Sequence, residues 1–330
     1  MFKRINWLWL PMMMSIFGVY AIQRGFATFA KSADFVVPHM QLGLGIFFTV
    51  MSLVVLVGGY LLDNYNSKNL FLISGLLGAV GIVSVPYSPW AFGILFGTAA
   101  AFLKLAPYSA PMKIYNENEA VKICPQAAAK NLGGAAFILF LGGLLISLGW
   151  NYVTTILAAF FMAACLFSYL ILPNDKIEGW KWSIFKESSK SIKFWGFMVY
   201  FFFMCGIYYV AIMGFYPALK GIGFTATTAT TTLAISYLCA GALRWPAAYL
   251  GNYMRLPLMW IGVAGMAIAI FLTKIHPVGA LVLFTLSSTI HTPNYWAYCK
   301  EQWGPRYIAT IIALGFVFQY LGAGVFYGKW

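Results

Sequence analysis

The sequence predicts an all-α membrane protein whose chain crosses a lipid bilayer many times. Of its 330 residues, 62% are hydrophobic and only 9% are charged, and the basic residues lie mainly in short breaks between apolar runs. A soluble globular domain has about 25% charged residues, so most of this chain must be solvated by lipid. The aromatic content of 18% agrees, because Trp and Tyr concentrate at membrane interfaces.

A helix that spans a membrane needs about 20 consecutive apolar residues. Runs of this kind predict eleven spans, at residues 7–30, 42–62, 70–88, 91–112, 128–149, 152–172, 194–217, 228–250, 257–273, 277–297 and 307–327. The first run is longer than the apolar region of a signal peptide, which has about 7–15 residues, so we interpret it as the first span. The Thr-rich stretch at 225–232 precedes another span and is interpreted as a helix N-terminus.

The only long polar connection is segment 173–193, which separates the first six predicted helices from the last five. It is rich in lysine and amphipathic, so part of it is expected to lie on the membrane surface. We therefore predict an N-terminal six-helix bundle at residues 1–172, a cytoplasmic linker at 173–193 and a C-terminal bundle at 194–330.

The distribution of basic residues predicts the orientation. With the N-terminus inside, the inner segments contain 14 Lys and Arg residues, the outer segments contain four, and three more lie within helices. This bias favours a cytoplasmic N-terminus and supports the predicted number of spans, and we expect a multi-pass protein of a bacterial inner (plasma) membrane. The same bias explains the net charge of +13, and nucleic acid is not an expected partner because the cations do not form one polar face.

A short internal repeat divides the chain into two similar halves. The segment LLDNY at 61–65 is echoed by YLGNY at 249–253, and each segment follows the second helix of its half. A basic residue follows in both cases, Lys68 or Arg255. Two halves of the same orientation indicate a parallel repeat. Six helices in each half would make twelve, so the last helix is apparently missing.

The connection between the second and third helices resembles the signature Gly-x-x-x-Asp-(Arg)-x-Gly-(Arg)-Lys of the major facilitator superfamily. Gly59, Asp63 and Lys68 match it. The segment departs from it at three positions, Asn64, Asn66 and Ser67. The resemblance implies a transporter in which two helical bundles rock around a central site.

In that family this loop holds the inner gate closed. Asp63 is expected to cap or brace the start of the following segment, and Lys68 to keep the turn on the inner side. The repeat suggests Asn252 and Arg255 as the equivalent gate residues of the second half. That second loop lacks an acidic residue of its own.

The charges within the predicted spans point to the substrate. No carboxylate lies in the middle of a span, but Arg24, Lys104 and Arg244 lie within the first, fourth and eighth helices. Inserting each of these charged side chains at the bilayer centre costs at least about 2.5–3.5 kcal/mol of free energy. An anionic substrate would supply the missing partner, since Arg binds carboxylate or phosphate through two hydrogen bonds. Alternatively, Arg24 extends to the outer interface and Arg244 braces the nearby loop.

The polar run SSTIHTPNYW in the tenth helix is a second candidate site. Pro293 weakens the backbone hydrogen bonds there, and broken helices with exposed hydroxyl and amide groups often line binding sites. His291 either carries a proton or binds substrate, or it is a buried histidine with satisfied hydrogen bonds. Further substrate-binding candidates are Tyr20, Tyr108, Asn131 and Asn294. Tyr208 and Tyr209 are interpreted as packing residues.

Two subfamilies compete for the closest resemblance. YAIQRGFATFA resembles the first helix of the organophosphate:phosphate antiporters, which would put Arg24 at or next to their phosphate-binding arginine, but CGIYY at 205–209 lacks the second arginine. AAAKNLGGAA at 127–136 and GALRWPAAYL resemble the nitrate/nitrite porters, which would make Arg244 a nitrate-binding arginine. The oxalate/formate exchangers are a third possibility.

The sequence therefore predicts a secondary active transporter that exchanges a small anion, such as an organic anion, phosphate or a phosphate ester. Transport resembling that of the nitrate/nitrite porters is the alternative, and a non-transporting scaffold or accessory subunit of a membrane complex is the alternative of a different class. We expect no enzyme activity, because P-loop, HExxH and Ser-His-Asp patterns are missing. No cofactor or metal is expected, and the protein acts as a monomer or within a larger membrane complex.

Overall fold

The computed structural model describes residues 39–114, 131–136, 142–172, 182–303 and 308–326, together with Val19, Ile22 and Leu139. All the regular secondary structure in these residues is helical. In the first part of the chain the helices are α2 (Met40–Asn64), α3 (Ser67–Val83), α4 (Pro89–Ala91), the π-helical turn η1 (Phe92–Phe96), α5 (Gly97–Ile114) and α7 (Gly142–Ile171). In the second part they are α8 (Trp182–Ser188), α9 (Ile192–Gly221), α10 (Ala226–Leu272), α11 (Pro277–Trp303) and α12 (Ile308–Phe326).

Two of these helices contain a break where the sequence predicts the boundary between two spans. In α7 the break is at Gly149, whose φ of 75° is a left-handed conformation that glycine adopts at little cost. In α10 it is at Met254, with φ −144° and ψ 47°. The apolar runs predict boundaries between spans at 149–152 and 250–257, and the two breaks fall within these intervals.

The packing of α11 shows that the chain reverses direction at Met254. Along the first part of α10, Ser236 bonds to Thr285 and Arg244 bonds to Thr292, so this part runs parallel to α11. Along the second part, Gly262 lies against His291 and Gly265 lies against Ser287, so the order is opposite. α11 therefore lies between two antiparallel parts of α10.

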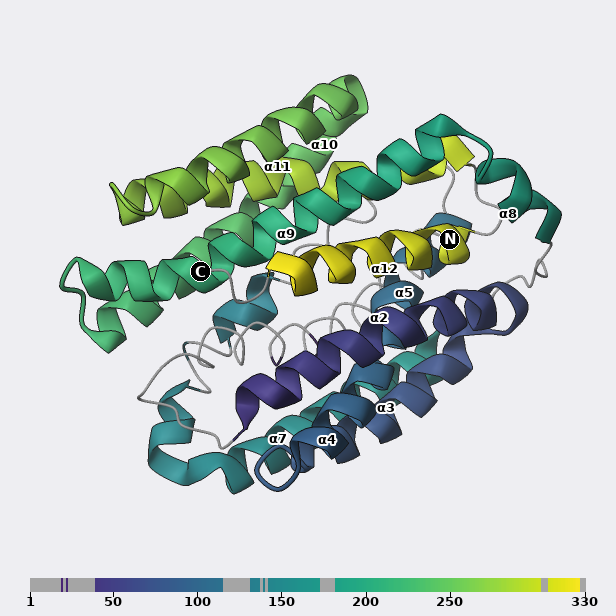
Figure 1. The fold of residues 1–330 in the computed structure, drawn as a ribbon. Coiled ribbons are helices and arrows are strands. Elements are labelled where there is room, and N and C mark those ends of the chain that lie inside the picture. Colours follow the sequence, from purple (N-terminus) through teal and green to yellow (C-terminus); the bar gives the residue numbers. More distant parts are fainter. Residues whose placement is uncertain are drawn as a thin grey trace.

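Figure 1 shows α2, α3, α4, α5 and α7 on one side of the molecule and α9, α10 and α11 on the other. α12 lies between these groups, where it packs against α9 as well as against α2 and α5. Many contacts between the two halves of the chain therefore involve α12, and the ring contact between Phe48 on α2 and Tyr209 on α9 adds a direct one. This position places α12 in contact with both halves of the chain.

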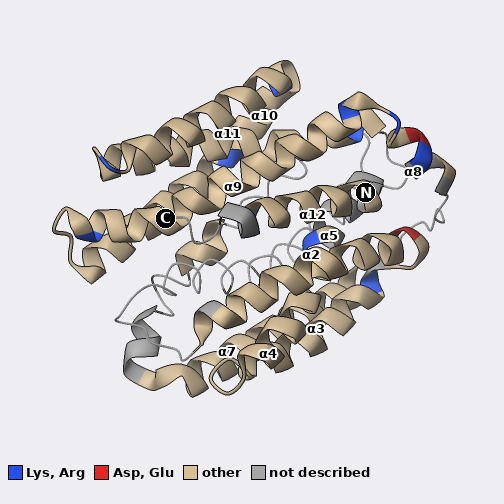
Figure 2. Cartoon of the chain, in the orientation of Figure 1, with Lys and Arg blue, Asp and Glu red and all other residues tan. Residues whose placement is uncertain are grey.

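The distribution of polarity is that of a membrane protein. Figure 2 shows long uncharged stretches along the helices, with most charged residues at helix ends and on α8 and a few basic residues within helices. Among the described residues, four helices are long and apolar enough to cross a membrane, within α2, α7, α9 and α10. Shorter apolar helices occur at Lys68–Val83, Pro89–Leu105 and Thr310–Gly322. α11 is 27 residues long but is not among them, because its polar run lowers its hydropathy.

Replacing Gly322 with Ala is expected to lower the free energy of unfolding by about 1–3 kcal/mol, the usual cost of overpacking. A Cβ atom at Gly322 would lie 2.1 Å from the carbonyl oxygen of Phe202 on α9, and a backbone atom cannot move aside as a side chain can. Thermal unfolding in detergent measures the effect. Gly196→Ala is the matched control, because a Cβ atom there would have no neighbouring atom within 4 Å; equal stability of the two variants would contradict this account of α12.

Candidate functional site

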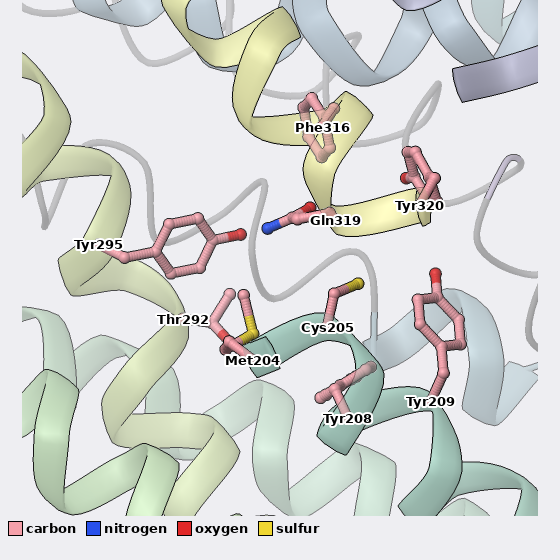
Figure 3. Close-up of a pocket in the computed structure, with 9 residues that line it drawn as sticks. All are labelled: Met204, Cys205, Tyr208, Tyr209, Thr292, Tyr295, Phe316, Gln319 and Tyr320. Carbon is pink, nitrogen blue, oxygen red and sulfur yellow. The ribbon is translucent and has the colours of Figure 1, made fainter. Parts of the chain in front are cut away.

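A cavity lies between α9, α11 and α12. The empty space between its lining atoms is about 380 Å³ with open solvent included, and the part that admits water-sized molecules is about 20 Å³, so in this conformation it holds water rather than a larger ligand. The residues that line it are Met204, Cys205, Tyr208 and Tyr209 from α9, Thr292 and Tyr295 from α11, and Phe316, Gln319 and Tyr320 from α12. Figure 3 shows the Tyr295 hydroxyl directed towards the Gln319 amide, with the Tyr209 and Tyr320 side chains together at the other end.

Lys104, in the other half of the molecule, contacts a residue that lines this cavity. Its side chain is completely buried in α5, and its ammonium group donates a hydrogen bond to the hydroxyl of Tyr320 on α12. The same nitrogen lies 4.5 Å from the centroid of the Tyr320 ring. A residue that the sequence singled out for its cost in lipid therefore has a polar partner at the edge of the cavity.

Arg244 approaches the same cavity from α10. It is also completely buried, and its guanidinium Nη2 donates a hydrogen bond of 3.1 Å to the hydroxyl of Thr292. This contact holds the guanidinium in the α10–α11 interface. Lys104 and Arg244 thus contact hydroxyl groups that line one cavity, although they lie on helices of different halves.

The polar run of α11 serves mainly to pack the helix. The helix is not broken at Pro293, because α11 continues from Pro277 to Trp303, although Pro293 has no N–H to donate to the preceding turn. Asn294 donates hydrogen bonds to carbonyl oxygens of Ile290 and Ala247 at 2.7 and 3.5 Å, and a Cβ at Gly251 would collide with it. Small residues of α10 therefore let the polar side chains of α11 approach closely, and only Thr292 and Tyr295 of this run line the cavity.

His291 lies outside the cavity lining, one position before Thr292. It is buried and shares a hydrogen bond with the hydroxyl of Tyr200 on α9. Its ring stacks on that of Tyr295 with centroids 5.0 Å apart. Of the two interpretations of His291, this arrangement favours a buried histidine that connects α9 and α11.

The remaining predicted substrate residues are less informative. Asn131 is buried in a described helical segment. Tyr108 lies on α5, but its side chain is outside the described part of the structure. Arg24 and Tyr20 also lie outside the described residues.

The interpretation of Tyr208 and Tyr209 as packing residues is incomplete, because both line the cavity. Tyr208 also packs against Phe284 with ring centroids 5.3 Å apart, so packing accounts for only part of its contacts. Gln319 and Tyr320 are cavity residues that the sequence analysis does not identify. A polar glutamine in the middle of an otherwise apolar span is the signal that points to this helix face.

Asp63 has a different partner from the one that the sequence predicts. Its carboxylate is 2% exposed and accepts a hydrogen bond of 3.2 Å from the backbone N–H of Thr310 and another from the Thr310 hydroxyl. Thr310 is in the first turn of α12, where an acceptor satisfies an otherwise unpaired N–H and the helix dipole favours a negative charge. Asp63 therefore braces the start of α12 across the two halves.

The other residues of this loop hold the turn itself. The side chain of Asn66 caps α3 by accepting a 3.1 Å hydrogen bond from the backbone N–H of Lys68. The ammonium of Lys68 lies 4.9 Å from the centroid of the Tyr169 ring on α7. Gly59 is buried in the last turns of α2. The three matches to the loop signature therefore differ in role, and Asp63 is the one that contacts the other half.

The equivalent loop of the second half obtains its acid from another helix. Arg255, just after the break in α10, forms an ion pair with Glu301 near the end of α11. Its guanidinium also lies 3.5 Å from the side-chain oxygen of Asn252. The acidic residue that YLGNYMR lacks is thus supplied by Glu301, and both contacts stay within the second half.

Comparisons with known proteins agree with this architecture. The family model of the Major Facilitator Superfamily matches residues 126–327. A search of curated protein sequences returned no match. Among solved structures, the E. coli fucose:proton symporter FucP superposes with a TM-score of 0.68 at 14% identity, covering 96% of this chain and 89% of that one.

Other solved structures give the same picture. FucP in the outward conformation has a TM-score of 0.69 at 15% identity, with 96% of this chain and 89% of that chain covered. The proton:xylose symporter XylE bound to 6-bromo-6-deoxy-D-glucose has a TM-score of 0.68 at 13% identity, with 96% and 87% covered. At these identities the likeness establishes the fold alone. Since the family model matches more than half of the chain, this chain belongs to the Major Facilitator Superfamily, whose members are membrane transporters and not enzymes.

Proposed function

We propose that this transporter moves a small anion, such as an organic anion, phosphate or a phosphate ester, by exchange across the membrane. The observation that carries the proposal is the convergence of two buried cations on one cavity. Lys104 contacts Tyr320 and Arg244 contacts Thr292, and both partners line the cavity. A bound anion between them would replace hydrogen bonds from a cation to a neutral hydroxyl with contacts between opposite charges, whose attraction is stronger in a buried site.

The distribution of acidic residues supports an anion over a cation. The described acidic residues are Asp63, Glu187 and Glu301, which lie at helix ends or on α8. Asp63 contacts Thr310 and Glu301 contacts Arg255. A cation in the cavity would meet the positive potential of Lys104 and Arg244, and like charges in a low-dielectric site repel strongly.

The proposal includes alternating access between two bundles, residues 1–172 and 194–330, with about eleven spans and an N-terminus on the cytoplasmic side. The contact between Asp63 and Thr310 supports a gate at the end of the molecule where these residues lie, here named the Asp63 end. The outward conformation of the similar FucP structure fits a closed gate at this end. The cytoplasmic position of the Asp63 end rests on the charge bias of the sequence.

A neutral sugar taken up with a proton is the second candidate function. The hydroxyl and amide groups of Tyr295, Gln319 and Thr292 in the cavity favour it, since neutral polyhydroxy compounds are recognised by such groups. The similar solved structures are also sugar:proton symporters. A nitrate/nitrite substrate is a variant of the anion proposal, favoured by the position of Arg244 beside the cavity.

Counterflow into proteoliposomes distinguishes these functions. Vesicles are loaded with unlabelled phosphate, glycerol 3-phosphate, nitrate, nitrite, oxalate, L-fucose or D-xylose, and uptake of the same labelled compound is measured. We expect transient accumulation of at least one anion and none of either sugar. Accumulation of a sugar driven by a pH gradient would favour the second function, and transport of none of the compounds would favour a scaffold.

A further inference from the structure

α12 is joined to the second half of the molecule by close backbone packing. A Cβ at Gly315 would lie 2.9 Å from the ring of Phe201, and a Cβ at Gly322 would lie 2.1 Å from the carbonyl oxygen of Phe202. Both phenylalanines belong to α9. Contacts this close do not slide easily, since packed interiors transmit displacement rather than absorb it. We therefore treat α9 and α12 as parts of one unit.

Polar contacts join α12 to the first half. Thr310 bonds Asp63 near the start of the helix, and Tyr320 bonds Lys104 ten residues later. At a rise of about 1.5 Å per residue these contacts are about 15 Å apart along the helix axis. The first contact lies at the Asp63 end, whereas the second lies beside the cavity, so only the second is positioned to respond to a bound substrate.

The side chain of Tyr320 contacts two residues of the first half and also lines the cavity. Its hydroxyl accepts the hydrogen bond from Lys104, its ring lies 6.1 Å from that of Phe48 on α2, and its surface lines the cavity. In Figure 3 the side chains of Tyr320 and Tyr209 lie at the same end of the cavity. The same side chain thus contacts the first half, its own half and the space available to a substrate.

We infer that Tyr320 is a substrate-site residue whose hydroxyl accepts the hydrogen bond of Lys104 while no anion is bound. When an anion binds, the Lys104 ammonium leaves Tyr320 and bonds to the anion instead. The inference rests on the proposed anion transport. Binding of the anion would break the contact between α5 and α12 and so loosen the connection between the halves. Substrate occupancy is thereby linked to the rocking movement, and Tyr320 and Lys104 form the link.

The order of interaction strengths supports this exchange of partners. A hydrogen bond between two charged groups is stronger than one from an ammonium to a neutral hydroxyl, most of all in a buried site. The ammonium of Lys104 can turn between partners because the lysine side chain is flexible and its donors rotate. An anion within reach of Lys104 would therefore displace the Tyr320 hydroxyl.

The test compares Tyr320→Phe with Tyr208→Phe. Both replacements remove one hydroxyl from the same cavity, but the Tyr208 ring packs against Phe284 within the second half. Spin labels on Tyr65→Cys and Tyr253→Cys report the separation of the halves at the Asp63 end. These are equivalent positions of the internal repeat, with exposures of 58% and 75%. The exposed Cys239 and also Cys124 are first replaced by Ser.

Without added anion, Tyr320→Phe is expected to shift the label distances towards longer values, whereas Tyr208→Phe keeps the wild-type distribution. In the wild type, the anion that gives counterflow produces a similar shift. Tyr320→Phe is also expected to bind that anion about tenfold more tightly, because Lys104 no longer gives up a hydrogen bond. This gain separates a substrate-site role from a purely structural one, which would weaken binding or leave it unchanged.

Wild-type distances and wild-type affinity in Tyr320→Phe would overturn the inference, and so would identical behaviour of the two Tyr→Phe variants. Failure of the proposed anion transport is recognised by a different result, in the wild-type protein. If phosphate, glycerol 3-phosphate, nitrate, nitrite and oxalate all fail to bind the wild-type protein, the anion proposal and the exchange of partners fail together. A shift of the apo distances in Tyr320→Phe would then show only a structural contact between the halves.

Discussion

Replacing Lys104 with Gln is expected to lower the rate of anion counterflow by about a hundredfold or more, the usual cost of removing one partner of a buried ion contact. The ammonium is completely buried on α5 and reaches the cavity through Tyr320. Gln keeps a similar length and a hydrogen-bond donor but has no charge. Initial rates in proteoliposomes measure the effect.

The Lys104→Gln variant should fold normally. A buried charge is itself costly, so its removal leaves stability unchanged or raises it, and thermal unfolding in detergent checks this. Lys220→Gln is the control, because it removes the same charge from an exposed position at the end of α9. Lys104→Arg should retain part of the activity. Full counterflow by a well-folded Lys104→Gln protein would refute the assignment of Lys104 to the substrate.

Replacing Asp63 with Ala is expected to open the Asp63 end and to slow transport about tenfold or more. The carboxylate is buried and accepts two hydrogen bonds from Thr310 at the start of α12. Hydrogen bonds to a charged group contribute about 1.5–3 kcal/mol, and the helix dipole adds to this. Without them the state in which this end is closed becomes less populated.

The same pair of spin labels at Tyr65 and Tyr253 measures the change in this gate. Thr310→Val should give a smaller shift, because it removes the hydroxyl but keeps the backbone N–H that also contacts Asp63. Asn64→Ala is the control, since the neighbouring Asn64 side chain donates to the carbonyl of Tyr60 within its own helix at 2.8 Å. A larger effect from Asn64→Ala than from Asp63→Ala would contradict the cross-half role of Asp63.

The helices themselves were largely predictable from the sequence. The apolar runs at 42–62, 194–217 and 277–297 correspond to α2, α9 and α11, each longer than predicted by a few residues at one or both ends. The break at Gly149 lies where two runs meet. Local physics explains this success, because each spanning helix must satisfy its own backbone hydrogen bonds and expose apolar side chains to lipid.

The partners of the polar residues were much harder to predict. Lys104 and Arg244 stand out because a buried cation is costly, but nothing in the sequence connects them to Tyr320 and Thr292. The polar run of α11 suggests a broken, cavity-lining helix, whereas Asn294 packs against the small residue Gly251. Polarity along one helix shows that a partner is needed, but it does not show whether that partner is a substrate or a neighbouring helix.

The sequence by itself determined the class of protein, the approximate positions of the helices and the cost of the buried cations, since these follow from composition and from interactions between residues close along the chain. Only the tertiary structure decided that the LLDNY loop braces α12 through Asp63 and Thr310, and that two cations from different halves approach one cavity. These contacts join residues more than two hundred positions apart or on separate helices. Their geometry depends on how whole helices pack, and an apolar surface specifies burial without specifying the neighbour.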